Sequence, residues 1–155
     1  EFFKKAKAEG VHTNLDTSGN PFTDQEPWHS GWLELMKYTD LVMLDIKQID
    51  EQEHIKLTGH SNKNILAMAR ELSDMKKPVW IRHVLVPDGS DKDEYLHRLA
   101  DFIHTLSNVE RVEVLPYHTL GKFKWENLGL SYPLEGVNPP TQERIDNARK
   151  ILGAI

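Results

Sequence analysis

The sequence predicts an α/β protein built around a parallel β-sheet. Short apolar segments that are typical of buried strands alternate along the chain with longer segments whose apolar residues recur at helical spacing. The strongest of the short segments is continuously apolar, which is typical of a strand covered on both faces, as in a parallel sheet. Because strands that alternate with helices are joined by right-handed crossovers, the order of the segments predicts about four βα units in a single domain over residues 1–155.

The chain opens with a predicted helix and a short strand. Residues 1–9 read as the end of a helix that Gly10 terminates, and residues 11–16 read as a strand that ends in turn residues. The spacing of Thr23 and Glu26 predicts a capping box at the start of the next helix, which carries two tryptophans on its apolar face.

The middle of the chain contains the strongest predicted strand. The segment over residues 41–48 begins with apolar residues and ends with polar ones. Asp50 and Glu53, which follow it, have the spacing of a second capping box. This box is expected to open a short helix that ends at Leu57. A longer helix follows over residues 65–75, where apolar residues return every three or four positions.

Two further strands and two helices are predicted in the second half. Residues 79–87 and 109–118 read as strands, and Ser90 is the expected N-cap of the helix between them. A polar, glycine-containing loop is expected over residues 120–140. Thr141 then begins the last helix.

The composition excludes several classes of function. The formal net charge is -5 at pH 7, so the chain lacks the basic surface that sequence-independent nucleic-acid binding requires. No apolar run approaches the roughly 20 residues that span a bilayer, and no signal peptide is present, so we expect a cytoplasmic protein that does not bind membranes. The chain contains no cysteine, which excludes disulfides and any iron–sulfur cluster held by cysteines of this chain. Because it begins at Glu1 with a helix-like pattern, we expect it to be a fragment.

Polar side chains gather where the predicted strands end. Asp45 and Lys47 are two residues apart in a strand, so both side chains point to one face while Ile46 points to the other. Arg82 lies in the next strand. Because the chemistry of βα folds is found at the carboxyl ends of strands, Asp45 and Lys47 are candidates for a functional pair. A simple ion pair at the strand end, reaching solvent, is the alternative.

The ends of the first and last strands carry three more candidates. Asp16 and Thr17 begin the sequence Asp-Thr-Ser-Gly, which is also a natural turn. His118 follows the last strand and is either a ligand contact or an ordinary, partly buried histidine.

Four motifs together resemble one enzyme family. LDTSG, LVMLDIKQ, VWIRHVLVP and VLPYHTLGKFKW occur in this order, each on a predicted strand or at its end. They resemble the C-terminal part of the radical S-adenosyl-L-methionine (SAM) enzymes of the glycyl-radical-activating family, from about Val11 to the end of the chain. The resemblance implies a partial, TIM-like (βα)6 barrel of which this chain supplies the third to sixth strands.

The resemblance also implies a chemistry and a set of partners. Members of the family hold a [4Fe–4S] cluster through a CxxxCxxC motif, take an electron from a donor such as flavodoxin, and cleave SAM to a radical. In anaerobic glucose metabolism that radical removes a hydrogen atom from a glycine of pyruvate formate-lyase. This chain lacks the CxxxCxxC motif, so the resemblance implies a fragment that is inactive by itself.

Individual residues match the family's motifs. The residues that the resemblance assigns to SAM binding are Asp45, Ile46, Lys47 and His118. The residues that it assigns to a monovalent cation are Asp16, Thr17, Asp45 and, through its backbone carbonyl, Met43. Arg82 matches a position that would hold the backbone of the substrate peptide.

Two other functions stay open at this point. Lys47 at a strand end could form a Schiff base, as in aldolase-type lyases, without any cluster. The chain could also be a non-catalytic module that binds a glycyl radical enzyme. Because two strands of the implied barrel are missing, residues 11–16 would lack one neighbour, and we expect the fragment to self-associate through this edge or through the barrel mouth.

Overall fold

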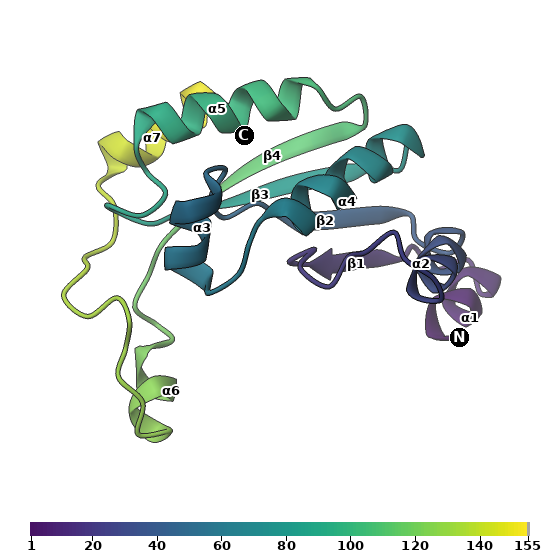
Figure 1. The fold of residues 1–155 in the computed structure, drawn as a ribbon, viewed down its shortest axis with the longest axis horizontal. Helices are drawn as coiled ribbons and strands as arrows, with labels where there is room; N and C mark the ends of the chain where they lie inside the picture. The colour runs from purple at the N-terminus through teal and green to yellow at the C-terminus, as the bar shows by residue number, and fades with distance from the viewer. Residues whose placement is uncertain (155) are drawn as a thin grey trace.

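In a computed structural model, which describes residues 1–154, the chain forms one four-stranded parallel sheet flanked by helices (Figure 1). The strands are β1 (Asn14–Thr17), β2 (Leu41–Asp45), β3 (Val79–Leu85) and β4 (Val109–Pro116). The helices are α1 (Phe2–Ala8), α2 (Trp28–Met36), α3 (Glu51–Thr58), α4 (Lys63–Asp74), α5 (Asp93–His104), α6 (Lys122–Asn127) and α7 (Gln142–Leu152). The strands lie in the order β1-β2-β3-β4 and all pairs are parallel, which confirms the predicted α/β class.

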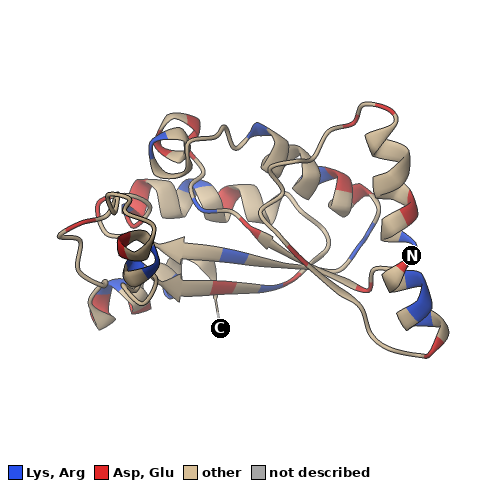
Figure 2. Cartoon of the chain, turned by 90° about the horizontal axis from the view of Figure 1, so that it is seen from below, with Lys and Arg blue, Asp and Glu red and all other residues tan. Residues whose placement is uncertain are grey.

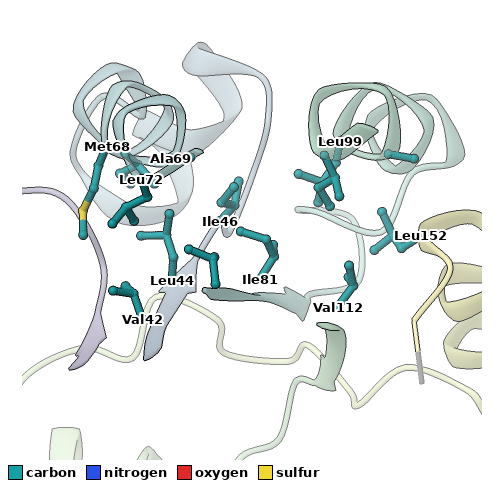
Figure 3. Packing of buried hydrophobic residues seen from close by; sticks show 14 of the residues in the cluster. Val42, Leu44, Ile46, Met68, Ala69, Leu72, Ile81, Leu99, Val112 and Leu152 are labelled. Atoms are coloured by element: carbon teal, nitrogen blue, oxygen red, sulfur yellow. The ribbon is translucent and has the colours of Figure 1, made fainter. Parts of the chain in front are cut away.

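The hydrophobic core lies between the sheet and the helices α4 and α5, with α7 packed beside α5 (Figures 1 and 3). Leu44 and Ile81 project from β2 and β3 towards these helices and are fully buried. Leu72 of α4 and Leu99 of α5 meet them from above. Apolar residues at helical spacing in α4 and α5 were therefore correctly read as core positions.

The opposite side of the sheet differs from the sequence-based expectation that both faces are covered. In β2, for which cover on both faces is predicted, Met43 and Asp45 are only half-buried. Burial alternates along β3 as well, where only every second side chain is fully buried. The strands place a row of polar and aromatic side chains on this side, where Figure 2 shows acidic and basic positions along the strands. We call this the polar face; its residues are Asp16, Met43, Asp45, Trp80, Arg82, Arg111 and Glu113.

The predicted helix starts are partly confirmed. Asp50 accepts hydrogen bonds from the backbone amides of Gln52 and Glu53 and so caps α3, and Thr141 accepts one from Arg144 and caps α7. The reciprocal half of the capping box predicted for Asp50 and Glu53 is wrong, because the Asp50 amide donates to the side chain of Gln48, outside the helix, instead.

Two other predicted caps are wrong. Pro27 precedes α2, while the hydroxyl of Thr23 accepts from the amide two residues further on and forms a local turn. The N-cap position of α5 is occupied by Lys92 and not by Ser90. The Ser90 hydroxyl is used by the end of β3: it donates to the Val84 carbonyl and accepts from the Val86 amide. A serine near a helix start therefore serves the strand before it.

The observed elements also differ in extent from the predicted ones. The first strand begins at Asn14 rather than at residue 11, and β2 ends at Asp45 rather than at residue 48. The expected loop over residues 120–140 contains the short helix α6, which lies away from the sheet (Figure 1). Within residues 1–154, no helix combines the length and the apolar character needed to cross a membrane.

Candidate functional site

A cavity of about 270 Å³ opens at the carboxyl ends of β1 and β2. The loop after β1, the end of β2 and the helices α3 and α4 form its walls. The residues that line it are Ser18, Asn20, Asp45, Lys47, His54, Thr58, His60 and Ile65. Most of these side chains carry hydrogen-bonding groups, so the cavity suits a polar ligand.

Gly19 allows the loop after β1 to run close to the core. Its φ of +69° is in the left-handed region, and a Cβ atom at this position would lie 2.9 Å from Leu44 Cδ1. A larger residue would therefore push the loop outward. This close passage brings the neighbouring Ser18 and Asn20 to the cavity wall.

Asp45 and Lys47 form an ion pair on the cavity wall. Lys47 Nζ donates to Asp45 Oδ2 at 2.7 Å. The Lys47 side chain is 34% exposed and the Asp45 side chain is 16% exposed. The two side chains meet, as the sequence predicts, although Lys47 lies two residues beyond the end of β2. A carboxylate and an ammonium group are thus held together in a partly dry environment, where each can also bind a charged ligand group.

Arg82 joins this pair to β1. Its Nε donates to Asp45 Oδ1 at 3.0 Å, and its terminal nitrogen also forms an ion pair with the Asp16 carboxylate. Asp45 is the direct register partner of Arg82, which explains their proximity. The result is a chain of alternating charges, from Asp16 through Arg82 and Asp45 to Lys47, across three strands.

The cation-binding set that the resemblance implies is not assembled in this arrangement. The guanidinium of Arg82 contacts both the Asp16 and Asp45 carboxylates and supplies the positive charge that they share. The Thr17 hydroxyl instead accepts a hydrogen bond from the Gly19 amide at 3.0 Å. Among residues 1–154, no group of three or more histidine, aspartate or glutamate side chains could hold a metal ion. The two carboxylates are therefore paired with Arg82 in this structure rather than arranged around a cation.

The resemblance also implies a [4Fe–4S] cluster and SAM, and the residues of this chain fit only the second of these groups. A [4Fe–4S] cluster requires thiolate ligands, and the chain has no cysteine, so its residues do not fit the cluster. SAM carries an α-amino group and an α-carboxylate, which match the Asp45 carboxylate and the Lys47 ammonium group in the cavity wall. The residues present therefore fit the amino-acid part of SAM.

Two of the residues assigned to SAM lie outside the cavity wall. The Ile46 side chain is fully buried on the helix-covered side of the sheet, so this residue offers only its backbone to the site. His118 follows β4, is exposed, and does not belong to the residues that line the cavity. The structure thus brings together Asp16, Asp45, Lys47 and Arg82.

Six of the eight residues that line the cavity are not among the sequence-based candidates, and His54 and Thr58 are two of them. His54 is only 3% exposed, its Nδ1 lies 2.7 Å from the His60 carbonyl oxygen, and the Thr58 hydroxyl lies 3.0 Å from the same nitrogen. The spacing of His54 and Thr58, four residues apart on a short helix next to a functional strand end, is the signal that could have identified them.

Comparison with known proteins shows what the chain is similar to. No family model matches the chain. The pyruvate formate-lyase-activating enzyme of Streptococcus mutans is 55% identical over 150 residues, which is 97% of this chain and 57% of that enzyme. Nearly all of the chain is thus similar to part of a pyruvate formate-lyase-activating enzyme. It spans somewhat more than half the length of this relative.

Solved structures show that the fold of this chain is shared. A domain of pyruvate-formate lyase-activating enzyme from Bacteroides vulgatus superposes with a TM-score of 0.77 at 21% identity, over 98% of this chain and 81% of that domain. A radical SAM methyltransferase from Sphaerobacter thermophilus gives a TM-score of 0.62 at 17% identity, over 94% of this chain and 39% of that chain. The fold is the partial TIM-like barrel of radical SAM enzymes, as the motifs predicted.

Proposed function

We propose that this chain is the part of a radical SAM activase that binds SAM and presents it to a glycine of pyruvate formate-lyase. The observation that carries the proposal is the 55% identity to a pyruvate formate-lyase-activating enzyme along nearly the whole chain. The ion pair of Asp45 and Lys47 in the cavity supports it. In such enzymes SAM bound to a [4Fe–4S] cluster supplies a 5′-deoxyadenosyl radical.

Each residue of the site has a role in this proposal. The Asp45 carboxylate accepts hydrogen bonds from the SAM ammonium group, and the Lys47 ammonium group donates to the SAM carboxylate or hydroxyls. The Ile46 backbone and His118 complete the contacts. Arg82 orients Asp45 through their hydrogen bond, and in this proposal it also binds backbone carbonyls of the substrate peptide.

The partners of the proposal follow from the family. Pyruvate formate-lyase is the target in the cytoplasm under anaerobic conditions, and flavodoxin is the class of electron donor. Because the chain has no cysteine, we expect it to bind partners without catalysing radical formation by itself.

Calorimetric titration of SAM tests the proposal. In a protein that carries this chain together with a CxxxCxxC segment, Lys47→Ala and Asp45→Ala should each weaken SAM binding about ten- to a hundredfold, because each removes a charge-assisted contact of about 1.5–3 kcal/mol. The cluster's absorption should be unchanged. Lys56→Ala is the matched control, since Lys56 also pairs with a carboxylate but on an exposed helix face. Unchanged SAM affinity in both site variants would contradict the proposal.

The Schiff-base lyase is less well supported by this geometry. A nucleophilic lysine needs a free amine, usually in an apolar pocket or beside another cation. The Lys47 nitrogen instead donates to the Asp45 carboxylate at 2.7 Å, so it is engaged in an ion pair. Borohydride should therefore fail to trap a keto substrate on Lys47.

A further inference from the structure

The five residues after β2 are held by side chains although they are not in a strand. Gln48 is fully buried; its Nε2 donates to the Gly89 carbonyl at 2.8 Å and its Oε1 accepts from the Asp50 amide at 3.1 Å. Asn62, also buried, donates from Nδ2 to the carbonyls of Gln48 and Ile49 at 3.0 and 2.8 Å. The segment that follows Asp45 and contains Lys47 therefore has a fixed path.

His83 holds the same segment from β3. It lies on the helix-covered side of the sheet between the apolar positions Ile81 and Leu85, and it is 2% exposed. Its Nδ1 lies 2.9 Å from the Ile46 carbonyl oxygen and its Nε2 lies 3.3 Å from the Ser90 carbonyl oxygen. Since both neighbours are acceptors, the ring donates, and the shorter distance assigns the proton of the neutral ring to Nδ1.

Two consecutive residues of β3 thus hold Asp45, the last residue of β2, and Ile46, the residue after it, from opposite faces. On the polar face, the Arg82 side chain binds the Asp45 carboxylate. Between the strands, the Arg82 carbonyl accepts from the Ile46 amide at 2.9 Å. On the covered face, the His83 ring binds the Ile46 carbonyl. The peptide units that connect Asp45 to Lys47 therefore have little freedom to rotate.

These buried polar groups occupy places where apolar side chains would be expected. Burying a polar group in a core is unfavourable unless it is hydrogen-bonded, and the other covered positions of β3 are apolar. The bonds of His83 and Gln48 converge on one short segment and tie it to the loop after β3 through Gly89 and Ser90. A network placed in this way orders the loops around the cavity.

We propose that His83 and Gln48 are positioning residues, which hold residues 46–49 so that the Asp45 carboxylate and the Lys47 ammonium group face the cavity. The proposal rests on the proposed function only in that these two groups are the ones that bind SAM. Neither His83 nor Gln48 touches the ligand; both act through the backbone between the two charged residues.

Amide hydrogen exchange of this chain, followed by NMR, tests the positioning directly. His83→Phe keeps a planar ring but removes the N–H, and Gln48→Leu removes both of its hydrogen bonds. Exchange at the Ile46 and Asp50 amides should accelerate about tenfold or more, since one hydrogen bond contributes about that factor to local opening. His83→Gln, which keeps an N–H within reach of the Ile46 carbonyl, should restore most of the protection.

Ile81→Val is the matched control, because it loosens the packing of the same covered face without removing a hydrogen bond. It should leave exchange at residues 46–50 near the level of the unmodified chain. If His83→Phe and Gln48→Leu accelerate exchange no more than Ile81→Val does, the positioning role is refuted, whatever the chain binds. If His83→Phe fails to fold, the exchange rates at residues 46–50 in Gln48→Leu and His83→Gln still test the positioning role.

SAM titration separates this proposal from the proposed function. In the cluster-containing protein, His83→Phe should weaken SAM binding about tenfold and His83→Gln should recover it. If Lys47→Ala weakens SAM binding and His83→Phe does not, the positioning role is wrong. If exchange accelerates as expected but Lys47→Ala leaves SAM binding unchanged, positioning is supported and the SAM assignment is the part that fails.

Discussion

Replacing Arg82 by methionine removes the central cation of the charge chain while keeping a long, unbranched side chain. The Arg82 and Asp45 side chains are each 16% exposed, and the Asp16 side chain is 61% exposed. In Arg82→Met the Asp45 carboxylate stays partly buried and keeps only Lys47 as a partner. The Asp16 carboxylate loses its partner but is largely in water.

The two contacts of Arg82 contribute unequally to stability. The partly buried bond to Asp45 is a charge-assisted hydrogen bond, so its loss costs about 1.5–3 kcal/mol. The exposed contact to Asp16 adds less than about 1 kcal/mol. We therefore expect the free energy of unfolding to fall by about 2–3 kcal/mol, which for a chain of this size lowers the melting temperature by about 4–12 °C.

Urea denaturation followed by circular dichroism measures this loss. Arg98→Met is the matched control: its side chain is 45% exposed and donates to Asp50 at 3.1 Å, so it should lose less than about 1 kcal/mol. A double-mutant cycle with Asp45→Asn isolates the pair. If Arg82→Met destabilises the chain no more than Arg98→Met, the guanidinium does not stabilise the site and the reasoning is refuted.

The same variant also tests the cation site that the family motifs imply. Without the guanidinium, Asp16 and Asp45 need another counter-ion, and carboxylate oxygens suit an alkali cation. Potassium or sodium should therefore stabilise Arg82→Met more than choline does at equal ionic strength, and should not do so in the unmodified chain. Equal stabilisation by all three cations would mean that these carboxylates do not form a cation site.

Three further predictions concern groups elsewhere in the fold. Burial holds the pKa of His83 below its usual 6.5, so below about pH 6.5 this ring stays neutral in the folded chain but takes up a proton in the unfolded chain. The free energy of unfolding should therefore fall as the pH decreases from about 6.5. In urea titrations at several pH values, His83→Asn should make this pH dependence weaker. Burial and the 2.7 Å hydrogen bond to Tyr132 raise the pKa of Tyr117 to about 12, so an alkaline absorbance titration should show one late phenol, absent in Tyr117→Phe. Because β1 pairs with β2 and lies at the edge of the sheet, the chain should self-associate in sedimentation velocity at micromolar concentration; a monomer would argue that another part of the chain shields this edge.

Local patterns were sufficient to predict most of the fold. Strands and helices were found where apolar runs or helical spacing are strong, as in β2, α4 and α5. The short helix α6 was missed because its six residues lie in a polar, glycine-containing segment without a recognisable period. The expectation of two covered faces was wrong for β2, because the helices of the core pack on one side of the sheet and Met43 and Asp45 on the other side are only half-buried.

The candidate site was predicted less completely, because it depends on contacts between distant segments. That Asp45 and Lys47 face the same way follows from their spacing alone. That Arg82 reaches both Asp45 and Asp16 depends on the strand register, which no local pattern specifies. Gln48 was not considered because a buried glutamine is rare, and only its partners in the loop after β3 explain its place.

The order of the strands also bears on how the chain folds. Every strand after the first pairs with the strand that precedes it in the sequence, so each ladder closes a loop that contains a single crossover connection. The entropy lost on closing such a loop grows only with the logarithm of its length. The sheet can therefore be assembled one βα unit at a time, from β1 towards β4, as the polypeptide leaves the ribosome. No strand has to be inserted between two that are already paired.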